Sequence, residues 1–312
     1  MSRTFHKISV VAPVLNEERV VEDFYRRTAA VLKKLSQDFE IIFVDDGSGD
    51  STLAKLKKLH DSDGSVKIIS FSRNFGHAAA ISAGLEYAGG DVVVIIDSDL
   101  QDPPEVIYEF VNKWQEGCDV VYGVRLKRKE FFLKRFSYWF FYRLLCRLSS
   151  VDMPLDAGDF SLLDRKVVKV INSLPERNRF LRGLRSWTGF KQYGLKYERA
   201  QRLAGQTKYS FKKLLRLAFD GIFSFSYLPL RLATFIGLVV AIVGFAAAMA
   251  VLYLRLARGV IGAPGFTSII ITILFVGGVQ LVAIGIVGEY LARVYDEVKH
   301  RQLYVIGEKV GL

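Results

Sequence analysis

The chain has 312 residues, of which 51% are apolar, and a formal net charge of +11. This length allows one large domain or two smaller ones with a substantial core. The positive charge favours acidic partners such as phosphates or an anionic membrane surface. The two cysteines, Cys118 and Cys146, have no CxxC spacing, and we recognise no signal peptide, which argues against a disulfide framework or a zinc site.

The first two-thirds of the chain alternate short apolar runs with helical patterns. The apolar runs predict strands at 8–15, 39–46, 66–72, 91–97 and 118–124. The intervening patterns predict helices at 17–35, 51–60, 77–88 and from Pro103 to about Trp114. Continuous apolar runs separated by helices predict an α/β fold with a mainly parallel sheet and helices on both faces.

Ligands of such sheets bind outside the carboxyl ends of the strands. Asp45-Asp46 and Asp97-Ser98-Asp99 follow two of the predicted strands. We therefore expect these two acidic clusters to converge on one crevice.

Two later segments, 127–150 and 210–230, combine basic residues with many aromatic and aliphatic ones. This composition predicts amphipathic helices lying at a membrane interface. For 127–150 the alternative is a helix packed under the sheet with its basic side in water.

The C-terminal third contains two long uncharged stretches separated by Arg255 and Arg258. About 20 apolar residues span a bilayer, so we predict transmembrane helices at about 232–256 and 264–291. The chain then divides into a catalytic domain (1–209), a juxtamembrane helix (210–230), a membrane hairpin (231–295) and a tail (296–312).

The charges that flank the hairpin indicate its orientation. The side shared by the first domain and the tail carries more basic residues than the connecting loop: Lys212, Lys213, Arg216, Arg231, Arg293, Lys299 and Arg301. The positive-inside rule therefore predicts a multi-pass protein of the plasma (inner) membrane with the catalytic domain in the cytoplasm. Gly277, Gly278, Gly285 and Gly288 suit close helix packing, which favours a homotetramer or homodimer.

The turns after the strands lack the glycine-rich loops that bind dinucleotides and triphosphates, namely GxGxxG and the Walker loop. A divalent metal on carboxylates is another way to neutralise a diphosphate, and Mg²⁺ and Mn²⁺ prefer oxygen ligands. Asp97 and Asp99 would share a face of an extended segment, and Gln101 would continue that alternation as a third oxygen ligand.

Six motifs, in order and followed by two predicted spans, carry a resemblance to a known family: VAPVLNEE, VDDGSGDST, SRNFGHAAAISAGLEYAGGD, IDSDLQDPPE, DAGDFSLLDR and GQTKYS. The chain resembles the polyprenyl-phosphate glycosyltransferases of glycosyltransferase family two, which include dolichyl-phosphate mannose synthases and bacterial glucosyl carriers. The resemblance covers nearly the whole chain and implies the A-type nucleotide-diphospho-sugar transferase fold and inverting transfer.

The resemblance implies roles for residues on the donor side. Those that would contact the nucleotide-sugar are Pro13, Asn16, Glu17, Asp45, Asp46, Arg73, His77 and Asp97. Asp97, Asp99 and Gln101 would hold Mg²⁺ or Mn²⁺ on the diphosphate. His77 could equally be a helix-start residue, Glu18 a favourable charge in the first turn of a helix, and Asp50 a helix cap.

On the acceptor side the resemblance implies that Asp159 is the base, with Asp156 as the alternative. A phosphate monoester has a second pKa near 6, so the acceptor is largely ionised at neutral pH and either aspartate could instead orient it. Many relatives have an arginine after GDF, where this chain has Ser161. The basic residues that would bind the acceptor phosphate are Arg125, Arg128, Arg199, Arg202 and Lys208, with the attraction of lipid headgroups as the alternative.

We therefore expect transfer of one sugar, UDP-glucose being the expected donor, to undecaprenyl phosphate for cell-envelope glycosylation. GDP-mannose and a UDP-aminoarabinose type of donor are alternatives. A processive synthase would carry QxxRW, but Trp187 lies in RSWTG without the glutamine. A non-catalytic membrane-anchored anion-binding module would leave the acidic strand ends unexplained, and no nucleic-acid partner is expected.

Overall fold

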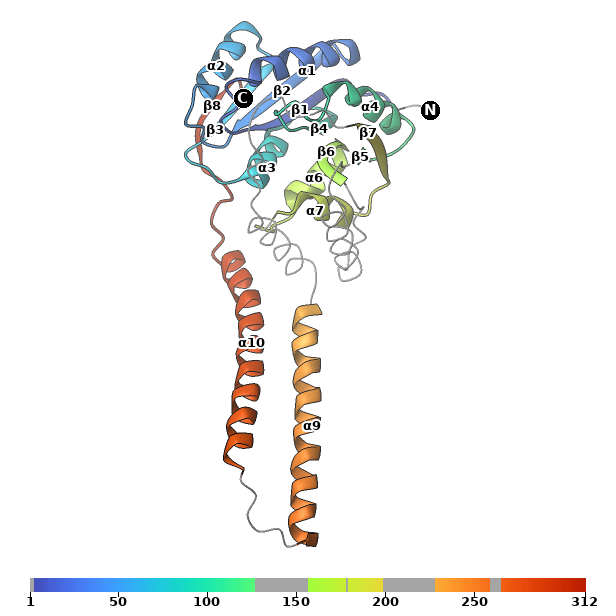
Figure 1. Cartoon of the computed structure of the whole chain (residues 1–312). Coiled ribbons are helices and arrows are strands. Elements are labelled where there is room, and N and C mark those ends of the chain that lie inside the picture. The colour runs from blue at the N-terminus through green and yellow to red at the C-terminus, as the bar shows by residue number, and fades with distance from the viewer. Residues whose placement is uncertain (1–2, 127–156, 178, 199–227, 259–264) are drawn as a thin grey trace. The chain divides into compact units, whose positions relative to one another are not determined.

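A computed structural model of the chain describes residues 3–126, 157–177, 179–198, 228–258 and 265–312. The chain divides into an α/β unit and a helical unit (Figure 1). The α/β unit comprises Met1–Lys213 and Arg301–Leu312, and the helical unit comprises Leu214–His300. The end of the chain therefore belongs to the α/β unit and is not a separate tail.

The described strands of the α/β unit form one sheet. In the order β7-β5-β6-β4-β1-β2-β3-β8, their bounds are Gln192–Glu198, Val120–Leu126, Ala157–Asp164, Val92–Ile95, Lys7–Val14, Asp38–Asp45, Val66–Phe71 and Ile306–Val310. β1 pairs in parallel with β2 and β4, β2 with β3, and β5 with β7. β6 runs antiparallel between β4 and β5, and β8 is antiparallel to β3. The predicted mainly parallel sheet is confirmed.

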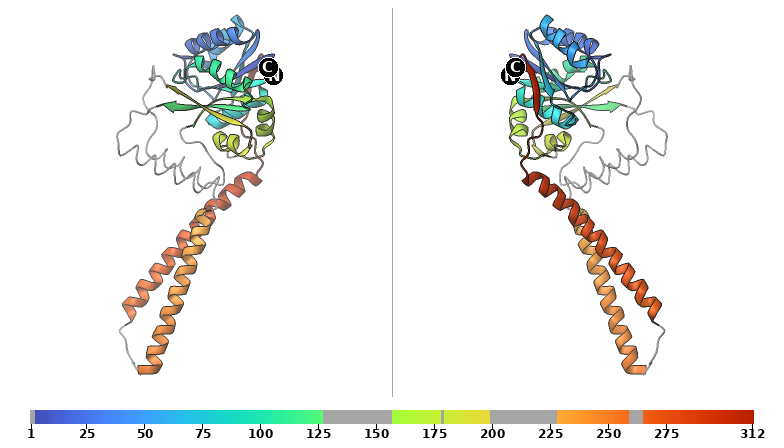
Figure 2. Two further views of the ribbon diagram at one scale, coloured as in Figure 1. Left: turned by 90° about the vertical axis from the view of Figure 1, so that its right-hand side faces the viewer. Right: turned by 90° about the vertical axis from the view of Figure 1, so that its left-hand side faces the viewer.

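Helices cover both faces of this sheet, as Figures 1 and 2 show for the blue helix α1 and the yellow-green helix α6. The described helical segments are α1 (Val21–Leu35), α2 (Thr52–Ser62), α3 (His77–Tyr87), the short 3₁₀ turn η1 (Pro104–Val106), α4 (Ile107–Gln115), α6 (Arg165–Ser173) and α7 (Leu181–Trp187). Phe24 of α1 and Phe110 of α4 belong to one core, and Ala80 of α3 and Val168 of α6 belong to the other.

The central strands are apolar throughout because both of their faces are buried. In β1, Ile8, Val10 and Ala12 face the core that contains α1, while Val11 faces the core that contains α3. Gly84 of α3 lies directly on Val11, and a Cβ at this glycine would overlap the Val11 side chain. This close approach fixes α3, which begins at His77, against the central strand.

The C-terminal segment adds an edge strand to the sheet. Beside β8, the Ser72 amide donates to the Val305 carbonyl at 3.0 Å. The Tyr304 ring stacks on Phe71 with 4.9 Å between ring centroids, and its hydroxyl donates to Glu86. The residues after the last helix therefore return to the same sheet as the residues of the N-terminal half.

The helical unit contains α9 (Leu228–Arg258) and α10 (Phe266–Val298), whose apolar side chains are largely exposed. In the described part of the chain, Phe275–Val298 is the one stretch that is long and apolar enough to cross a membrane, and Leu232–Ala247 is a shorter apolar stretch. Both predicted spans thus fall largely within helices. The predicted interfacial segment 127–150, and 210–230 up to its last three residues, lie outside the described residues.

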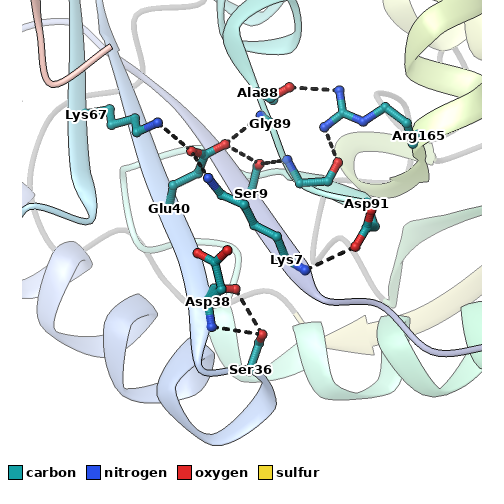
Figure 3. Close-up of polar contacts among 11 residues, drawn as sticks. Lys7, Ser9, Ser36, Asp38, Glu40, Lys67, Ala88, Gly89, Asp91 and Arg165 are labelled. Carbon is teal, nitrogen blue, oxygen red and sulfur yellow. Dashed lines mark hydrogen bonds and ion pairs between the residues drawn. The ribbon is translucent and has the colours of Figure 1, made fainter.

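A buried carboxylate organises the amino ends of the parallel strands (Figure 3). Glu40 is 1% exposed and accepts hydrogen bonds from the Ser9 hydroxyl and the Gly89 amide, both at 2.6 Å. Lys7 and Lys67 form ion pairs with it at 2.8 and 2.7 Å. Glu40 therefore links β1, β2, β3 and the loop that leads to β4.

Candidate active site

The carboxyl ends of β1, β2 and β4 meet at one edge of the sheet, because these strands are adjacent and parallel. Pro13 lies near the end of β1, Asp45 ends β2, and Asp97 follows β4. The Ser98 hydroxyl donates to the Pro13 carbonyl at 3.0 Å and ties the turn after β4 to β1. The topology therefore places the strand ends that precede the two acidic clusters at one edge of the sheet, and their convergence on one crevice stays a prediction.

The carboxylates of Asp45 and Asp46 are both buried and bonded within the protein. Asp45 accepts from the Ser48 amide at 3.1 Å and from the Ser70 hydroxyl at 3.0 Å. Asp46 accepts from the amides of Phe75, at 2.7 Å, and of Gly76. Burial raises the pKa of Asp46, against the effect of these two amides. These acids brace the turn after β2 and the loop before α3, and their contact with a nucleoside stays a prediction.

The loop after β1 is joined to the loop after β2. Asn16 has a φ of 55°, in the left-handed region that asparagine tolerates. Its amide donates to the Ser48 hydroxyl at 3.0 Å, and its side-chain oxygen accepts from the Gly49 amide at 2.9 Å. The Glu17 amide donates to the Thr52 hydroxyl at 3.0 Å. The two predicted donor-binding loops therefore form one connected rim.

Arg73 extends this rim on its other side. Its guanidinium lies 4.0 Å from the centroid of the Phe75 ring and donates to the Asn74 carbonyl at 2.9 Å. Gly47 makes the approach of the two loops possible, since its φ is +75° and a Cβ there would lie 2.7 Å from the Arg73 carbonyl carbon.

The turn after β4 differs from the extended segment that the sequence suggested. β4 ends at Ile95, and Leu100 is buried with a φ of 58°, so the backbone turns within the motif. The Gln101 amide donates to the Asp99 carboxylate at 3.0 Å. Simple alternation therefore does not place Gln101 beside the two aspartates, and that argument for a third metal ligand was wrong.

Four charged side chains from four different segments contact one another in a row. His77, the first residue of α3, has its Nε2 atom 3.6 Å from an Asp97 oxygen and 3.7 Å from an Asp159 oxygen. Arg182 of α7 donates from Nε and Nη2 to the two oxygens of Asp159, both at 2.9 Å. Negative and positive groups thus alternate in the order Asp97, His77, Asp159, Arg182.

This arrangement determines the charge of each group. Burial alone would lower the pKa of His77, but Asp159 and Asp97 raise it to about 9. Burial opposes ionisation of Asp159, but Arg182 and His77 hold the pKa of that carboxyl far below its ordinary range. At neutral pH Asp159 is therefore an anion and His77 a cation, and an anion with so low a pKa is a poor proton acceptor.

Burial raises the pKa of Asp97, and His77 lowers it. The negative charges of Asp159, Asp102 and Asp99 raise the pKa further. A cation bound here would relieve that repulsion. In the described residues no group of three or more His, Cys, Asp or Glu side chains is placed to hold a metal. Mg²⁺ commonly takes one or two carboxylates plus substrate phosphates, so Asp97 and Asp99 fit a metal shared with a diphosphate.

Two arginines of α7 were not predicted as site residues from the sequence. Arg182 contacts Asp159, and Arg185, 1% exposed, donates to the Gly158 carbonyl at 3.4 Å. Burial lowers the pKa of Arg185 to about 10. Their spacing of three residues, which places them on one face of a helix, was the available signal.

Arg125 is one of the residues predicted to bind the acceptor phosphate. Arg125 lies in β5 opposite Tyr197 of β7. The remaining predicted acceptor-side residues lie outside the described residues: Asp156, Arg128, Arg199, Arg202 and Lys208.

Comparison with known proteins identifies the family of this chain. Residues 9–171 match the family model described as "Glycosyl transferase family 2". The chain belongs to glycosyl transferase family 2. This family 2 transferase is 47% identical over 305 residues to an uncharacterized glycosyltransferase, YkcC, of Bacillus subtilis, which covers 97% of this chain and 94% of the relative.

The transferase is also similar to proteins with more specific names. It is 44% identical over 303 residues to the bactoprenol glucosyl transferase of Shigella phage SfV, covering 96% of this chain and 98% of that protein. Among solved structures it is similar to glucosyl-3-phosphoglycerate synthase from Mycobacterium tuberculosis, with a TM-score of 0.48 and 23% identity over 70% of this chain and 78% of that one.

Proposed function

We propose that this family 2 transferase moves one glucose from UDP-glucose to a polyprenyl phosphate of the undecaprenyl type, with inversion at the anomeric carbon. The similarity to a bactoprenol glucosyl transferase over nearly the full length of both chains supports glucose and the lipid. The proposed reaction type depends on one observation: His77 lies between Asp97 and Asp159. One acid is therefore available to the donor and the other to the acceptor.

On the donor side, Asp97 and Asp99 lie where the sugar diphosphate would bind, at the carboxyl end of β4. A bound Mg²⁺ or Mn²⁺ would neutralise the diphosphate and stabilise the charge that develops on the leaving nucleotide. The rim built from Asn16, Glu17 and the turn after β2 would hold the nucleoside. Asp97 and Asp99 therefore act on the leaving group.

On the acceptor side, Asp159 does not need to remove a proton. The lipid phosphate is largely dianionic at neutral pH, since its second pKa is near 6. Its oxygen attacks the anomeric carbon from the face opposite the leaving nucleotide, and the fixed negative charge of Asp159 stabilises the positive charge that develops on the sugar. Arg125, Arg128, Arg199, Arg202 and Lys208 remain the proposed ligands of the acceptor phosphate, and Asp156 the alternative acid.

A donor screen tests the choice of sugar. The protein in detergent, with Mn²⁺ and undecaprenyl phosphate, should form labelled lipid from UDP-glucose at least about ten times faster than from GDP-mannose, UDP-aminoarabinose or other UDP-sugars, a difference of about 1.4 kcal/mol in transition-state binding. A faster reaction with any of those donors would replace glucose in the proposal. Loss of label when the metal is chelated would support the metal assignment.

The connectivity of the sheet supports a multi-pass topology. The chain leaves the α/β unit before α9, and β8, which follows α10, pairs with β3 in the same sheet. An even number of crossings is consistent with this connectivity, because the segments before α9 and after α10 belong to the same unit. We propose that α9 and α10 both cross, with the α/β unit in the cytoplasm and with copies associating through the glycines of α10.

Cysteine labelling checks this topology. With Cys118 and Cys146 both replaced by alanine, Gly265→Cys, just before α10, should react with a membrane-impermeant maleimide in intact cells. Glu308→Cys in β8, whose side chain is exposed, should react only after permeabilisation. Equal protection of both positions in intact cells would contradict the two-crossing proposal.

A further inference from the structure

Helix α7 is attached to one short segment of the sheet through two arginines. Arg182 donates two hydrogen bonds to the two carboxylate oxygens of Asp159, a bidentate fork with both bonds at 2.9 Å. One turn later, Arg185 donates to the Gly158 carbonyl, and its guanidinium lies 4.6 Å from the centroid of the Tyr122 ring. The segment around Asp159 is therefore held at both its backbone and its side chain.

His77 also contacts the Asp159 carboxylate. The Oδ2 atom that accepts from Arg182 Nη2 also lies 3.7 Å from His77 Nε2. The backbone carbonyl of Asp159 accepts from the Ser161 hydroxyl at 2.9 Å, so the residue is fixed at a third point. Rotation of the carboxylate away from this orientation would break the fork and move it away from His77.

We infer that Arg182 is a positioning residue for sugar transfer: its two hydrogen bonds hold the Asp159 carboxylate in one orientation beside His77, so that this acid presents a fixed negative charge to the sugar. This inference rests on the proposed function. A guanidinium fits a carboxylate in a planar fork, whereas a lysine offers only a point charge. Arg182 should therefore be replaceable by lysine only in part, although the charge is kept.

A double-mutant cycle between Arg182 and Asp159 tests this role. Arg182→Gln should lower kcat about 100-fold, the loss typical when a reacting group is misplaced, with the KM for UDP-glucose changed less than about threefold. Arg182→Lys should recover about tenfold of that loss, because it restores the charge without the fork. The double variant Arg182→Gln/Asp159→Asn should be within about threefold of Asp159→Asn alone, because Arg182 acts through Asp159.

Arg26→Gln provides the matched control, since Arg26 forms an exposed ion pair with Asp23 at 3.4 Å on α1. It should retain wild-type kcat. Thermal unfolding of every variant in the same detergent separates a lost fold from a lost orientation.

Four results would overturn the inference: an unchanged kcat in Arg182→Gln, full recovery of kcat by lysine, multiplicative losses in the double variant, or a loss of kcat that follows the loss of folded protein. With an active wild type, these results leave the proposed function standing. A wild type that transfers no sugar to a polyprenyl phosphate would instead overturn the proposed function, and this inference with it.

Discussion

Replacing Asp97 by asparagine should lower kcat about 1,000-fold, because the substitution removes about 4 kcal/mol of charge stabilisation at the leaving diphosphate. Asparagine has nearly the shape of aspartate but carries no charge, so the turn after β4 should persist. Asp97 also faces His77 across 3.6 Å, and its loss would leave the contact of His77 with Asp159 in place. The expected defect is therefore chemical and not structural.

Two measurements check this prediction. Steady-state kinetics with UDP-glucose and undecaprenyl phosphate give kcat, and titration of Mn²⁺ in the presence of UDP gives the metal affinity. Both should fall in Asp97→Asn and stay at wild-type values in Asp61→Asn, an exposed aspartate of α2. Wild-type metal affinity in Asp97→Asn would show that Asp97 does not hold the metal.

Replacing Glu40 by alanine should lower the free energy of unfolding of the α/β unit by about 3–5 kcal/mol, the typical cost of breaking a buried ion pair. The substitution would leave Lys7 and Lys67 without their 2.8 and 2.7 Å partner and would remove the acceptor of the Ser9 and Gly89 hydrogen bonds (Figure 3). At about 2–4 °C per kcal/mol the melting temperature should fall by about 6–20 °C.

Glu105→Ala is the matched control, since Glu105 pairs with Arg27 at 2.8 Å but both side chains are substantially exposed. Such pairs contribute about 0–1 kcal/mol, so the control should melt within a few degrees of wild type. Similar melting temperatures for the two variants would contradict the role given to Glu40.

The same carboxylate predicts a pH dependence of stability. Burial alone would raise the pKa of Glu40, but Lys67, Lys7, Ser9 and Gly89 lower it from 4.5 to about 2. Because the folded value lies below the unfolded one, the contribution of Glu40 is complete above about pH 4.5 and is lost as the pH falls toward 2. The difference in melting temperature between wild type and Glu40→Gln should therefore shrink across this window. A melting-temperature difference that stays constant down to pH 2 would contradict the predicted ionisation of Glu40.

The parallel part of the sheet was predictable because its strands are buried on both faces and read as continuous apolar runs. The observed β1, β2 and β3 begin and end within about one residue of the predicted ranges. β8 gave no such signal. The residues of its sequence, IGEKV, are exposed or only partly buried, so they form no continuous apolar run. The place of β8 depends instead on backbone pairing with β3, after the chain has passed through two long helices.

The site was predictable where one strand end or one motif places the residue. Asp97, Asp159 and His77 were named from the sequence, and the structure brings them together. The backbone turn at Leu100 could not be read from alternation, because a non-glycine residue in the left-handed region has no strong sequence signature. The contact of Arg182 with Asp159 depends on how α7 packs against β6, which no local pattern encodes.

The most direct test of the account is the identity of the product formed from UDP-glucose and undecaprenyl phosphate by the full-length protein in detergent with Mn²⁺. A single displacement on the α-linked donor predicts a glucose joined to the lipid phosphate in the β configuration. Transfer of one sugar predicts one glucose per lipid and one UDP released for each lipid modified. Mass spectrometry and NMR of the isolated lipid read both properties. An α-linked product, a lipid carrying several glucose residues, or no lipid-linked glucose would contradict the account.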